Sequence, residues 1–222
     1  MKILVLAPHP DDETLGCGGS LLRHKYEGDE LYWCIITNIS KELGWSEESI
    51  KTREKEIKAI EKKYSFSKVF NFKIPTTKVD TVPISDLIQK ITDVCKETKP
   101  DIVFLPFAGD IHTDHQLISK ASQSTLKWFR QPSIKKVLMY ETLSETNLNF
   151  ISKHKFNPNY FVNINRFIDK KIKAMKIYKS EINKHPFPRS VESIKSLAIL
   201  RGSQVNLKYA ESFEIIYDII DK

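Results

Sequence analysis

The sequence predicts an α/β fold, in which a single domain forms a Rossmann-like, mostly parallel sheet with helices on both faces. Three observations lead to this prediction. Short apolar runs alternate with segments of helical periodicity over residues 1–142, as expected of repeated strand–helix units. Runs such as Leu31–Thr37 are apolar throughout, which is typical of strands buried on both faces. At 222 residues, the chain is long enough to bury one sizeable core.

The first part of this pattern contains two strands and two helices. The apolar run Lys2–Ala7 predicts the first strand, and a helix over about Asp12–Tyr26 follows it. Leu31–Thr37 predicts the second strand. Ser46 is a suitable N-cap for a second helix, because its hydroxyl can accept a backbone N–H of the first turn. The apolar face of that helix extends to Tyr64.

The next part repeats the alternation and completes the predicted core. Lys68–Phe72 predicts a third strand, and the apolar stripe in Ile84–Cys95 has the period of a helix. Asp101–Pro106 predicts a fourth strand, and Thr113–Phe129 a fourth helix. Lys136–Glu141 predicts a fifth strand. Strands joined by helices in this way are expected to pair in parallel.

The pattern weakens after residue 142. "YFVNI" predicts a further strand, and Ile168–Ile182 and Val191–Leu200 have the periodicity of amphipathic helices. The sequence contains no linker, repeat or low-complexity segment. We therefore expect one domain, with residues 1–142 as its Rossmann-like core and residues 143–222 as an elaboration of it.

The charge of the chain is unevenly distributed but does not indicate a nucleic-acid partner. The formal net charge is +7, and residues 1–50 are acidic, so the basic excess lies in the remainder. Lys accounts for 29 of the 35 basic residues, and no basic tract is interleaved with aromatic residues. We predict a small-molecule substrate and no nucleic-acid partner.

The cysteines and apolar runs predict a cytoplasmic protein. Cys17, Cys34 and Cys95 form no CxxC pair, and an odd, scattered set favours a reducing compartment over a disulfide framework. The longest apolar stretches, such as Ile102–Ala108, are too short for a transmembrane segment. The apolar run at the start of the chain is too short for the core of a secretory signal.

Two strand ends carry most of the residues with chemical potential. The first strand leads into "HPDDE" and the fourth into "FAGDIHTDHQ". Three of the six histidines, His9, His112 and His115, fall in these two segments. In open α/β sheets, sites form just beyond the carboxyl ends of the strands, so these segments are expected to meet.

Two imidazoles and one carboxylate from these segments predict a metal site. His9 and Asp12 are three residues apart across a turn that enters a helix, and His115 can reach them from the other loop. Such a set of three ligands leaves positions open, as in catalytic zinc centres. A metal there would acidify water and polarise a carbonyl group.

The remaining polar residues of these segments fit supporting roles. Asp11 can take a proton from water as a general base. His112 can stabilise or protonate a tetrahedral intermediate. Asp114 is a candidate to orient a histidine through its second nitrogen, and Asp110 is another. Glu13 fits a helix first turn as well as a catalytic role, because acids favour the positive end of the helix dipole.

These segments resemble a known family. "PHPDDETLGCGG" and "DIHTDHQ" are similar to the two signature motifs of the LmbE-like (PIG-L) family of zinc-dependent N-acetylglucosaminyl deacetylases. "TREKE" at Thr52–Glu56 and "YAESF" at Tyr209–Phe213 are weaker matches, and together the four segments span most of the chain.

The resemblance implies a function and a set of roles. It implies a metal-dependent hydrolase that removes an acetyl group from the N-acetyl amine of an amino sugar or a sugar conjugate, including a nucleotide-linked one. It implies Zn²⁺ as cofactor, with Fe²⁺ as an alternative, and a homo-oligomer. It implies that Arg53 faces the sugar and that residues 143–222 face the substrate. It also implies the roles suggested above: His9, Asp12 and His115 as metal ligands, Asp11 as the general base and His112 as the oxyanion stabiliser.

Three other functions compete with this one. An amidase acting on a thiol-sugar conjugate would use the same site, so the motifs leave it open. Non-haem iron oxygenases also use two histidines and a carboxylate, but usually in β-rich folds. A receiver domain would need an acid after the third strand and a Lys after the fifth, and this chain has neither: "KVFNF" is followed by Lys73, and the fifth strand ends in "YETLSE".

Overall fold

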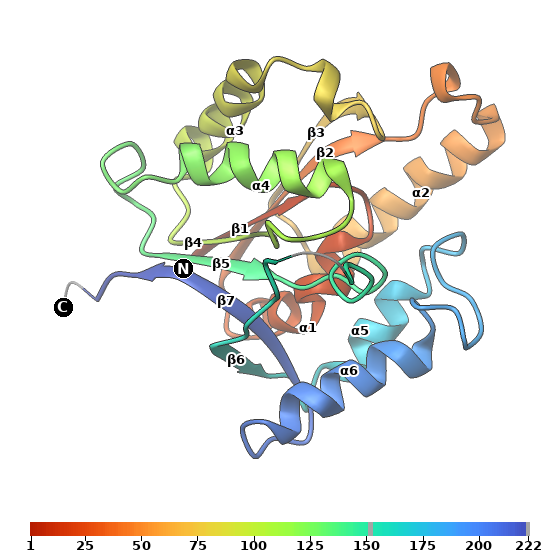
Figure 1. Ribbon diagram of the computed structural model, residues 1–222, viewed down its shortest axis with the longest axis vertical. Coiled ribbons are helices and arrows are strands. Elements are labelled where there is room, and N and C mark those ends of the chain that lie inside the picture. The colour runs from red at the N-terminus through yellow and green to blue at the C-terminus, as the bar shows by residue number, and fades with distance from the viewer. Residues whose placement is uncertain (151–152, 221–222) are drawn as a thin grey trace.

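A seven-stranded sheet forms the centre of the molecule (Figure 1). The structure is a computed structural model, and it describes residues 1–150 and 153–220. The strands are β1 (Lys2–Ala7), β2 (Glu30–Asn38), β3 (Lys68–Pro75), β4 (Ile102–Pro106), β5 (Lys136–Tyr140), β6 (Tyr160–Asn163) and β7 (Ala210–Asp218). The helices are α1 (Asp12–Tyr26), α2 (Glu47–Tyr64), α3 (Ile84–Thr98), α4 (Thr113–Thr125), α5 (Ile168–Met175) and α6 (Val191–Ser203).

The strand order is β3-β2-β1-β4-β5-β7-β6. The first five strands pair in parallel, while β7 runs antiparallel to both β5 and β6. The predicted fold class, a mostly parallel Rossmann-like sheet with helices on both faces, is confirmed. Because the chain builds the sheet outward from β1, first through β2 and β3 and then through β4 and β5 on the other side, the order has a switch point at β1.

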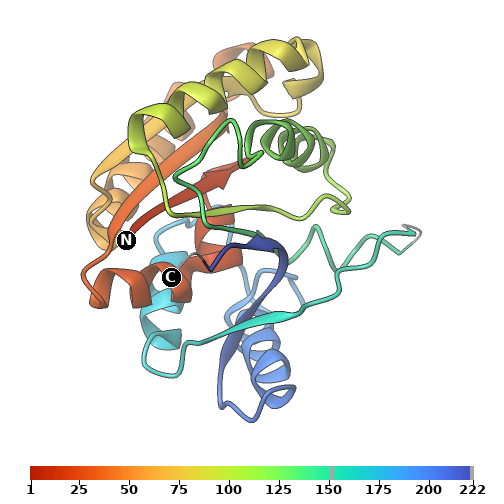
Figure 2. The same cartoon turned by 90° about the vertical axis from the view of Figure 1, so that its left-hand side faces the viewer.

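The helices form one layer on each face of the sheet (Figures 1 and 2). Helices α3 and α4 pack on one face against residues such as Leu4 and Leu6, which alternate along β1 with residues facing the other layer. Helices α1, α2, α5 and α6 contribute to the layer on the other face. None of the helices in the described residues is long and apolar enough to cross a bilayer.

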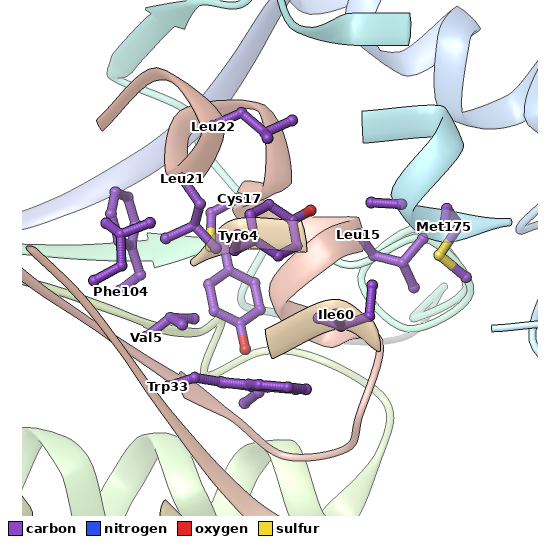
Figure 3. Packing of buried hydrophobic residues seen from close by; sticks show 14 of the residues in the cluster. Val5, Leu15, Cys17, Leu21, Leu22, Trp33, Ile60, Tyr64, Phe104 and Met175 are labelled. Atoms are coloured by element: carbon purple, nitrogen blue, oxygen red, sulfur yellow. The ribbon is translucent and has the colours of Figure 1, made fainter. Parts of the chain in front are cut away.

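The larger of the two cores holds helix α1 close to the sheet. Figure 3 shows Trp33 of β2, Tyr64 of α2 and Leu15 of α1 in this core, and all three side chains are buried. The close approach requires glycine at position 16, because a Cβ there would lie 2.2 Å from the Tyr140 ring of β5.

Two predicted helix ends were wrong, and one strand was not predicted. Helix α4 ends at Thr125 rather than Phe129, because the chain turns there to bury Leu126 against the core. Helix α5 ends at Met175 rather than Ile182, and the following segment turns to place Tyr178 in the interior. Strand β7 was not predicted as a strand, since only its first four residues are buried and the sequence therefore lacks a long apolar run.

Candidate metal and active site

The two motif segments meet at the carboxyl-terminal edge of the sheet. His9 lies between β1 and α1, while His112 is the N-cap residue of α4 and His115 lies in the first turn of that helix. Strands β1 and β4 are direct neighbours, which is why His9 and Asp114 come together although they are 105 residues apart. The two loops meet as predicted, because the strands that they follow are paired.

Three donor atoms from His9, Asp12 and His115 converge on one point. The distance from His9 Nδ1 to Asp12 Oδ2 is 3.2 Å, and the distance from His115 Nε2 to the same oxygen is also 3.2 Å. The two imidazole nitrogens are 3.3 Å apart. Two imidazole nitrogens and a carboxylate oxygen within 4.8 Å of one another form a donor set suited to a divalent ion.

A carboxylate lies behind each of these histidines. Asp110 Oδ2 is 2.8 Å from His115 Nδ1, and Asp114 Oδ2 is 3.2 Å from His9 Nε2. Asp114 is itself held by the backbone N–H of Thr77, at 2.8 Å. A ring nitrogen that donates to a carboxylate leaves the opposite nitrogen as an acceptor, so each carboxylate fixes the tautomer in which the inward nitrogen can bind a cation.

The charges of the cluster are strongly coupled in the metal-free protein. Burial disfavours a charged imidazole, but the hydrogen bonds to Asp114 and Asp12 outweigh it and raise the pKa of His9 to about 9. Burial alone would raise the pKa of Asp12, but His115 and His9 hold it far below its ordinary value. Asp12 is therefore ionised. A proton on the histidines balances its negative charge, and a bound metal ion would take the place of that proton.

Asp11 is held in a strained backbone conformation, and its carboxylate is left available. Its φ is 137° and its ψ is −27°, a region that residues other than glycine rarely adopt. Its backbone N–H donates to Glu13 Oε2 at 3.0 Å. Although it precedes α1, its side chain makes no capping bond, and none of the described residues donates a hydrogen bond to its carboxylate.

The environment of the Asp11 carboxylate suits it to accept a proton. Its carboxyl group is largely buried and lines the cavity described below. Burial, followed by the charges of Asp12 and Glu181, raises its pKa well above the ordinary value. A raised pKa makes a carboxylate a stronger base, which suits proton transfer near neutral pH.

Glu13 is neither a surface acid nor a side chain at the cavity. It is fully buried, and besides the Asp11 N–H its carboxylate accepts the hydroxyls of Thr14 at 2.5 Å and Tyr178 at 2.9 Å. The Tyr178 hydroxyl comes from the segment that follows α5. Glu13 therefore connects that segment to the backbone of Asp11.

His112 is arranged as a neutral donor. Its Nδ1 accepts the backbone N–H of Asp114 at 3.1 Å, which leaves the proton of the neutral ring on Nε2. Burial, followed by the neighbouring His9 and His115, lowers its pKa to about 4. The ring centroid lies 4.5 Å from that of His9, and His112 lines the cavity beside the donor cluster.

A cavity of about 240 Å³ opens beside the three donors. Asp11 and His112 line it on the motif side. Trp45 lines it from the loop before α2, and Arg53 lines it from α2 itself. The volume lies just below the range for ligand pockets, about 300–1,000 Å³, which suits a small ligand rather than a long chain.

Arg53 lies at this cavity but is held by several protein partners. Its guanidinium donates to the carbonyl oxygen of Pro10 at 2.8 Å, lies 3.2 Å from a Glu56 oxygen and forms an ion pair with Glu181. The contact with Pro10 also attaches α2 to the loop that carries His9 and Asp11.

Sequence reasoning missed Tyr178, Glu181 and Arg189. The last two line the cavity, and Tyr178 supports it through Glu13. Helical periodicity placed Tyr178 and Glu181 on an amphipathic helix, and the pattern carried no sign that the helix ends before them. "HPFPR" at residues 185–189 was a usable signal, because two prolines beside an Arg indicate a fixed loop that can present a charge.

Comparison with known families and proteins places this site in context. Residues 4–126, more than half of the chain, match the family model for PIG-L, described as GlcNAc-PI de-N-acetylase.

The chain belongs to the PIG-L family.

The matched PIG-L region contains both motif segments and therefore all three donor residues. A diacetylchitobiose deacetylase from Thermococcus kodakarensis is 21% identical over an alignment covering 97% of this chain and 83% of that protein. The PIG-L identity predicted from the motifs is thus confirmed, and the family and this relative are deacetylases.

Two solved structures resemble this PIG-L chain over almost its whole length. The conserved protein TT1542 from Thermus thermophilus is 27% identical, with a TM-score of 0.79 over 99% of this chain and 96% of that one. The 4-carboxy-2-hydroxymuconate hydratase GalB from Pseudomonas putida is 19% identical, with a TM-score of 0.73 over 100% and 98%. Because a hydratase shares the fold, the fold alone does not determine the reaction.

Proposed function

We propose that this protein is a metal-dependent N-deacetylase that hydrolyses the acetamide of an N-acetyl amino sugar, free or as part of a conjugate. One observation supports this most strongly: the carboxylate of Asp11, with no protein partner among the described residues, lines the same cavity as the donor cluster. The family and the Thermococcus relative are deacetylases, which favours amide hydrolysis over hydration.

The donor set fits Zn²⁺ as the cofactor, with Fe²⁺ as the alternative. His9, Asp12 and His115 would hold the ion, and Asp110 and Asp114 would orient the two imidazoles from behind. A divalent ion bound there would polarise the acetamide carbonyl and make water more acidic. Nitrogen and oxygen donors of this kind suit Zn²⁺ and Fe²⁺ better than Ca²⁺ or Mg²⁺.

The side chains around the donors account for the proton transfers. Asp11 accepts a proton from the attacking water as the new C–O bond forms. His112, neutral and protonated on Nε2, donates to the oxygen on which negative charge develops. When the C–N bond breaks, the proton held by Asp11 passes to the leaving nitrogen, so that acetate and a free amine are released.

We also propose the cellular setting of this activity. The three cysteines are buried and unpaired with one another, which supports a reducing, cytoplasmic location. Ile199 and Leu200 on the outer face of α6 are about half exposed, at 47% and 53%, which supports burial of that face in a homo-oligomer. An amidase acting on a thiol-sugar conjugate is the second candidate, because it would use the same donors and base.

A substrate screen tests the proposed reaction. Purified protein, loaded with Zn²⁺ or Fe²⁺, is incubated with N-acetylglucosamine, N,N'-diacetylchitobiose, a nucleotide-linked N-acetyl sugar and an N-acetylated thiol glycoside, and acetate is measured. We expect acetate release that is lost on chelation and restored by the metal. Release of a larger acyl group with no acetate would favour the amidase, and no amide hydrolysis on any substrate would contradict the proposal.

A further inference from the structure

The segment between α5 and α6 forms one wall of the cavity. Glu181 and Arg189 on this segment line the cavity together with Ser144, Glu145 and Asp11. In Figure 1 this connection lies on the same side of the molecule as the arrowheads of β2 and β3, which mark the carboxyl-terminal edge of the sheet. The motif residues supply the reacting side of the cavity, so this wall is available to contact the rest of the substrate.

Of the two guanidinium groups at the cavity, Arg189 is the better placed to contact a ligand. The Arg53 side chain is 8% exposed, and its groups are engaged by Pro10, Ser180, Glu56 and Glu181. The Arg189 side chain is 20% exposed.

Arg189 is fixed in place and still has donors to spare. It donates to the backbone oxygen of Glu181 at 2.9 Å, to Ser144 Oγ at 2.8 Å and to Glu181 Oε2 at 3.2 Å. A guanidinium has five N–H groups, so within the described residues one N–H on each terminal nitrogen has no protein acceptor.

Glu181 balances the charge of this wall. One of its oxygens pairs with Arg53 and the other with Arg189, so a single carboxylate is shared by two cations. Glu56 supplies a second carboxylate to Arg53. The wall therefore presents N–H donors and a carboxylate acceptor at fixed positions, without an excess of positive charge. Such an alternation of donors and acceptors suits hydroxyl groups.

We propose that the Arg189–Glu181 pair contacts the sugar of the substrate and selects an uncharged N-acetyl sugar over one that carries a phosphate. This inference rests on the proposed deacetylase function and adds the substrate class. A phosphate carries close to two negative charges and needs cations that are not already neutralised. The charge of a divalent ion held by the donors would be partly offset by the Asp12 carboxylate, and Asp11 and Glu145 add two further carboxyl groups to the lining.

Trp45, another lining residue of the cavity, fits the same class of substrate. Trp45 lines the cavity from the β2–α2 connection and is 47% exposed. A half-exposed indole offers an apolar face that an uncharged sugar ring can cover, and a phosphate there would lose hydration without gaining a cation.

A comparison of matched substrates tests the selection. The probes are methyl N-acetyl-glucosaminide and its 6-phosphate, and kcat/KM for acetate release is measured with the Zn²⁺-loaded protein. We expect the uncharged glycoside to be preferred by roughly tenfold or more, the scale of an uncompensated like-charge contact. A preference for the phosphate would overturn the proposal.

Glu181→Gln is the decisive variant. It leaves Arg53 and Arg189 without their shared carboxylate, so the preference is expected to move toward the phosphate by roughly tenfold. Glu27→Gln is the matched control, since Glu27 pairs with Arg23 at the exposed end of α1 and the same unit of charge is removed far from the cavity. An unchanged preference in Glu181→Gln, or an equal shift in both variants, would contradict the proposal.

Arg189→Lys separates substrate contact from support of the fold. Lys keeps the charge but loses the fork of donors, so KM for the uncharged glycoside is expected to rise severalfold while metal content stays the same. A lower Tm with unchanged KM would mean that Arg189 only supports the loop. Binding of both probes, measured by saturation-transfer NMR, is compared as well. If neither probe releases acetate, the proposed deacetylation fails for these glucosaminides. The relative binding of the two probes then still tests whether the cavity prefers the uncharged sugar.

Discussion

The two walls of the cavity are built in different ways. On the motif side, each of two strand ends supplies groups that are close in sequence: His9 and Asp12 are three residues apart, and Asp110 and His115 are five apart. The pairing of β1 with β4 then brings these two ends together. On the other side, Arg53 pairs with Glu181 across 128 residues, and Glu13 with Tyr178 across 165. The proposed reacting groups thus depend on local geometry at two paired strand ends, whereas the wall formed by Glu181 and Arg189 depends on contacts between distant segments, such as the packing of α5 against α1.

The comparison suggests which changes alter the chemistry and which alter the substrate. Substitutions on the motif side should change metal content or kcat. Substitutions on the α5–α6 side should change KM and selectivity, except where a residue reaches across to support Asp11. Glu13 lies behind the cavity and connects its two walls, because it binds the Asp11 backbone and the Tyr178 hydroxyl.

The largest effect is expected from the loss of a donor on the motif side. His115→Ala removes one of three donors and leaves Asp110 Oδ2 without its imidazole partner. Even loss of a supporting residue behind a ligand typically lowers metal affinity about 10–100-fold, so loss of the ligand should abolish stoichiometric binding and activity. Metal content is measured after dialysis, alongside circular dichroism to confirm folding. Full occupancy in a folded variant would rule out His115 as a ligand.

Metal uptake should depend on pH in a direction set by His9. Because the pKa of this imidazole is raised to about 9 in the metal-free protein, it is protonated at neutral pH and the incoming ion must displace a proton. Affinity should therefore rise with pH, by roughly tenfold per unit between pH 6 and 8 for this group alone. Competition with a chromophoric chelator measures it, and an affinity that is flat over this range would contradict the assignment of His9.

Glu13→Ala tests the link between the two walls. Loss of its carboxylate leaves the buried N–H of Asp11 without an acceptor, at a cost of about 1–3 kcal/mol, and frees a strained backbone. We expect kcat to fall roughly 10–100-fold, with metal content retained. Glu13→Gln is the control, since its amide oxygen can still accept this N–H and should restore most of kcat. Equal losses in both variants would require a role for the charge of Glu13 itself.

The smallest effect is expected at Arg53. Arg53→Lys keeps one positive charge near Glu181 but cannot hold Pro10, Glu56 and Glu181 together. KM should rise a fewfold, with unchanged metal content, and Tm should fall by a few degrees. Steady-state kinetics and thermal unfolding measure the two effects separately. Unchanged KM with a lowered Tm would reduce Arg53 to a structural residue.

The difference between short-range and long-range contacts also explains which features the sequence predicts. The five parallel strands, the helices between them and the residues at the two strand ends follow from periodicity and short-range spacing. The roles of Asp11, Asp12 and the histidines follow from the requirements of a metal site. Those roles stay predictions, but the structure brings the residues together in the geometry that they need.

The features that the sequence did not predict depend on contacts between distant segments, which short-range patterns do not encode. Periodicity extended α5 through Tyr178 and Glu181, although these side chains are committed to Glu13 and Arg53 in distant segments. Strand β7 was missed because it is buried over only part of its length. Glu13 had two interpretations from its position alone, and only burial and the Tyr178 hydroxyl show that it supports the backbone of Asp11.

The paired substitutions Asp11→Asn and Asp12→Asn test the central claim, that adjacent aspartates hold different roles. Asp12 lies among the donors, whereas the Asp11 carboxylate lines the cavity without a protein partner in the described chain. Metal content and kcat are measured for both variants. Asp12→Asn should lose metal. Asp11→Asn should keep it and lose roughly 10²–10⁴ in kcat, the usual contribution of a positioned base. Metal loss in Asp11→Asn, or near-normal turnover with metal bound, would contradict the account.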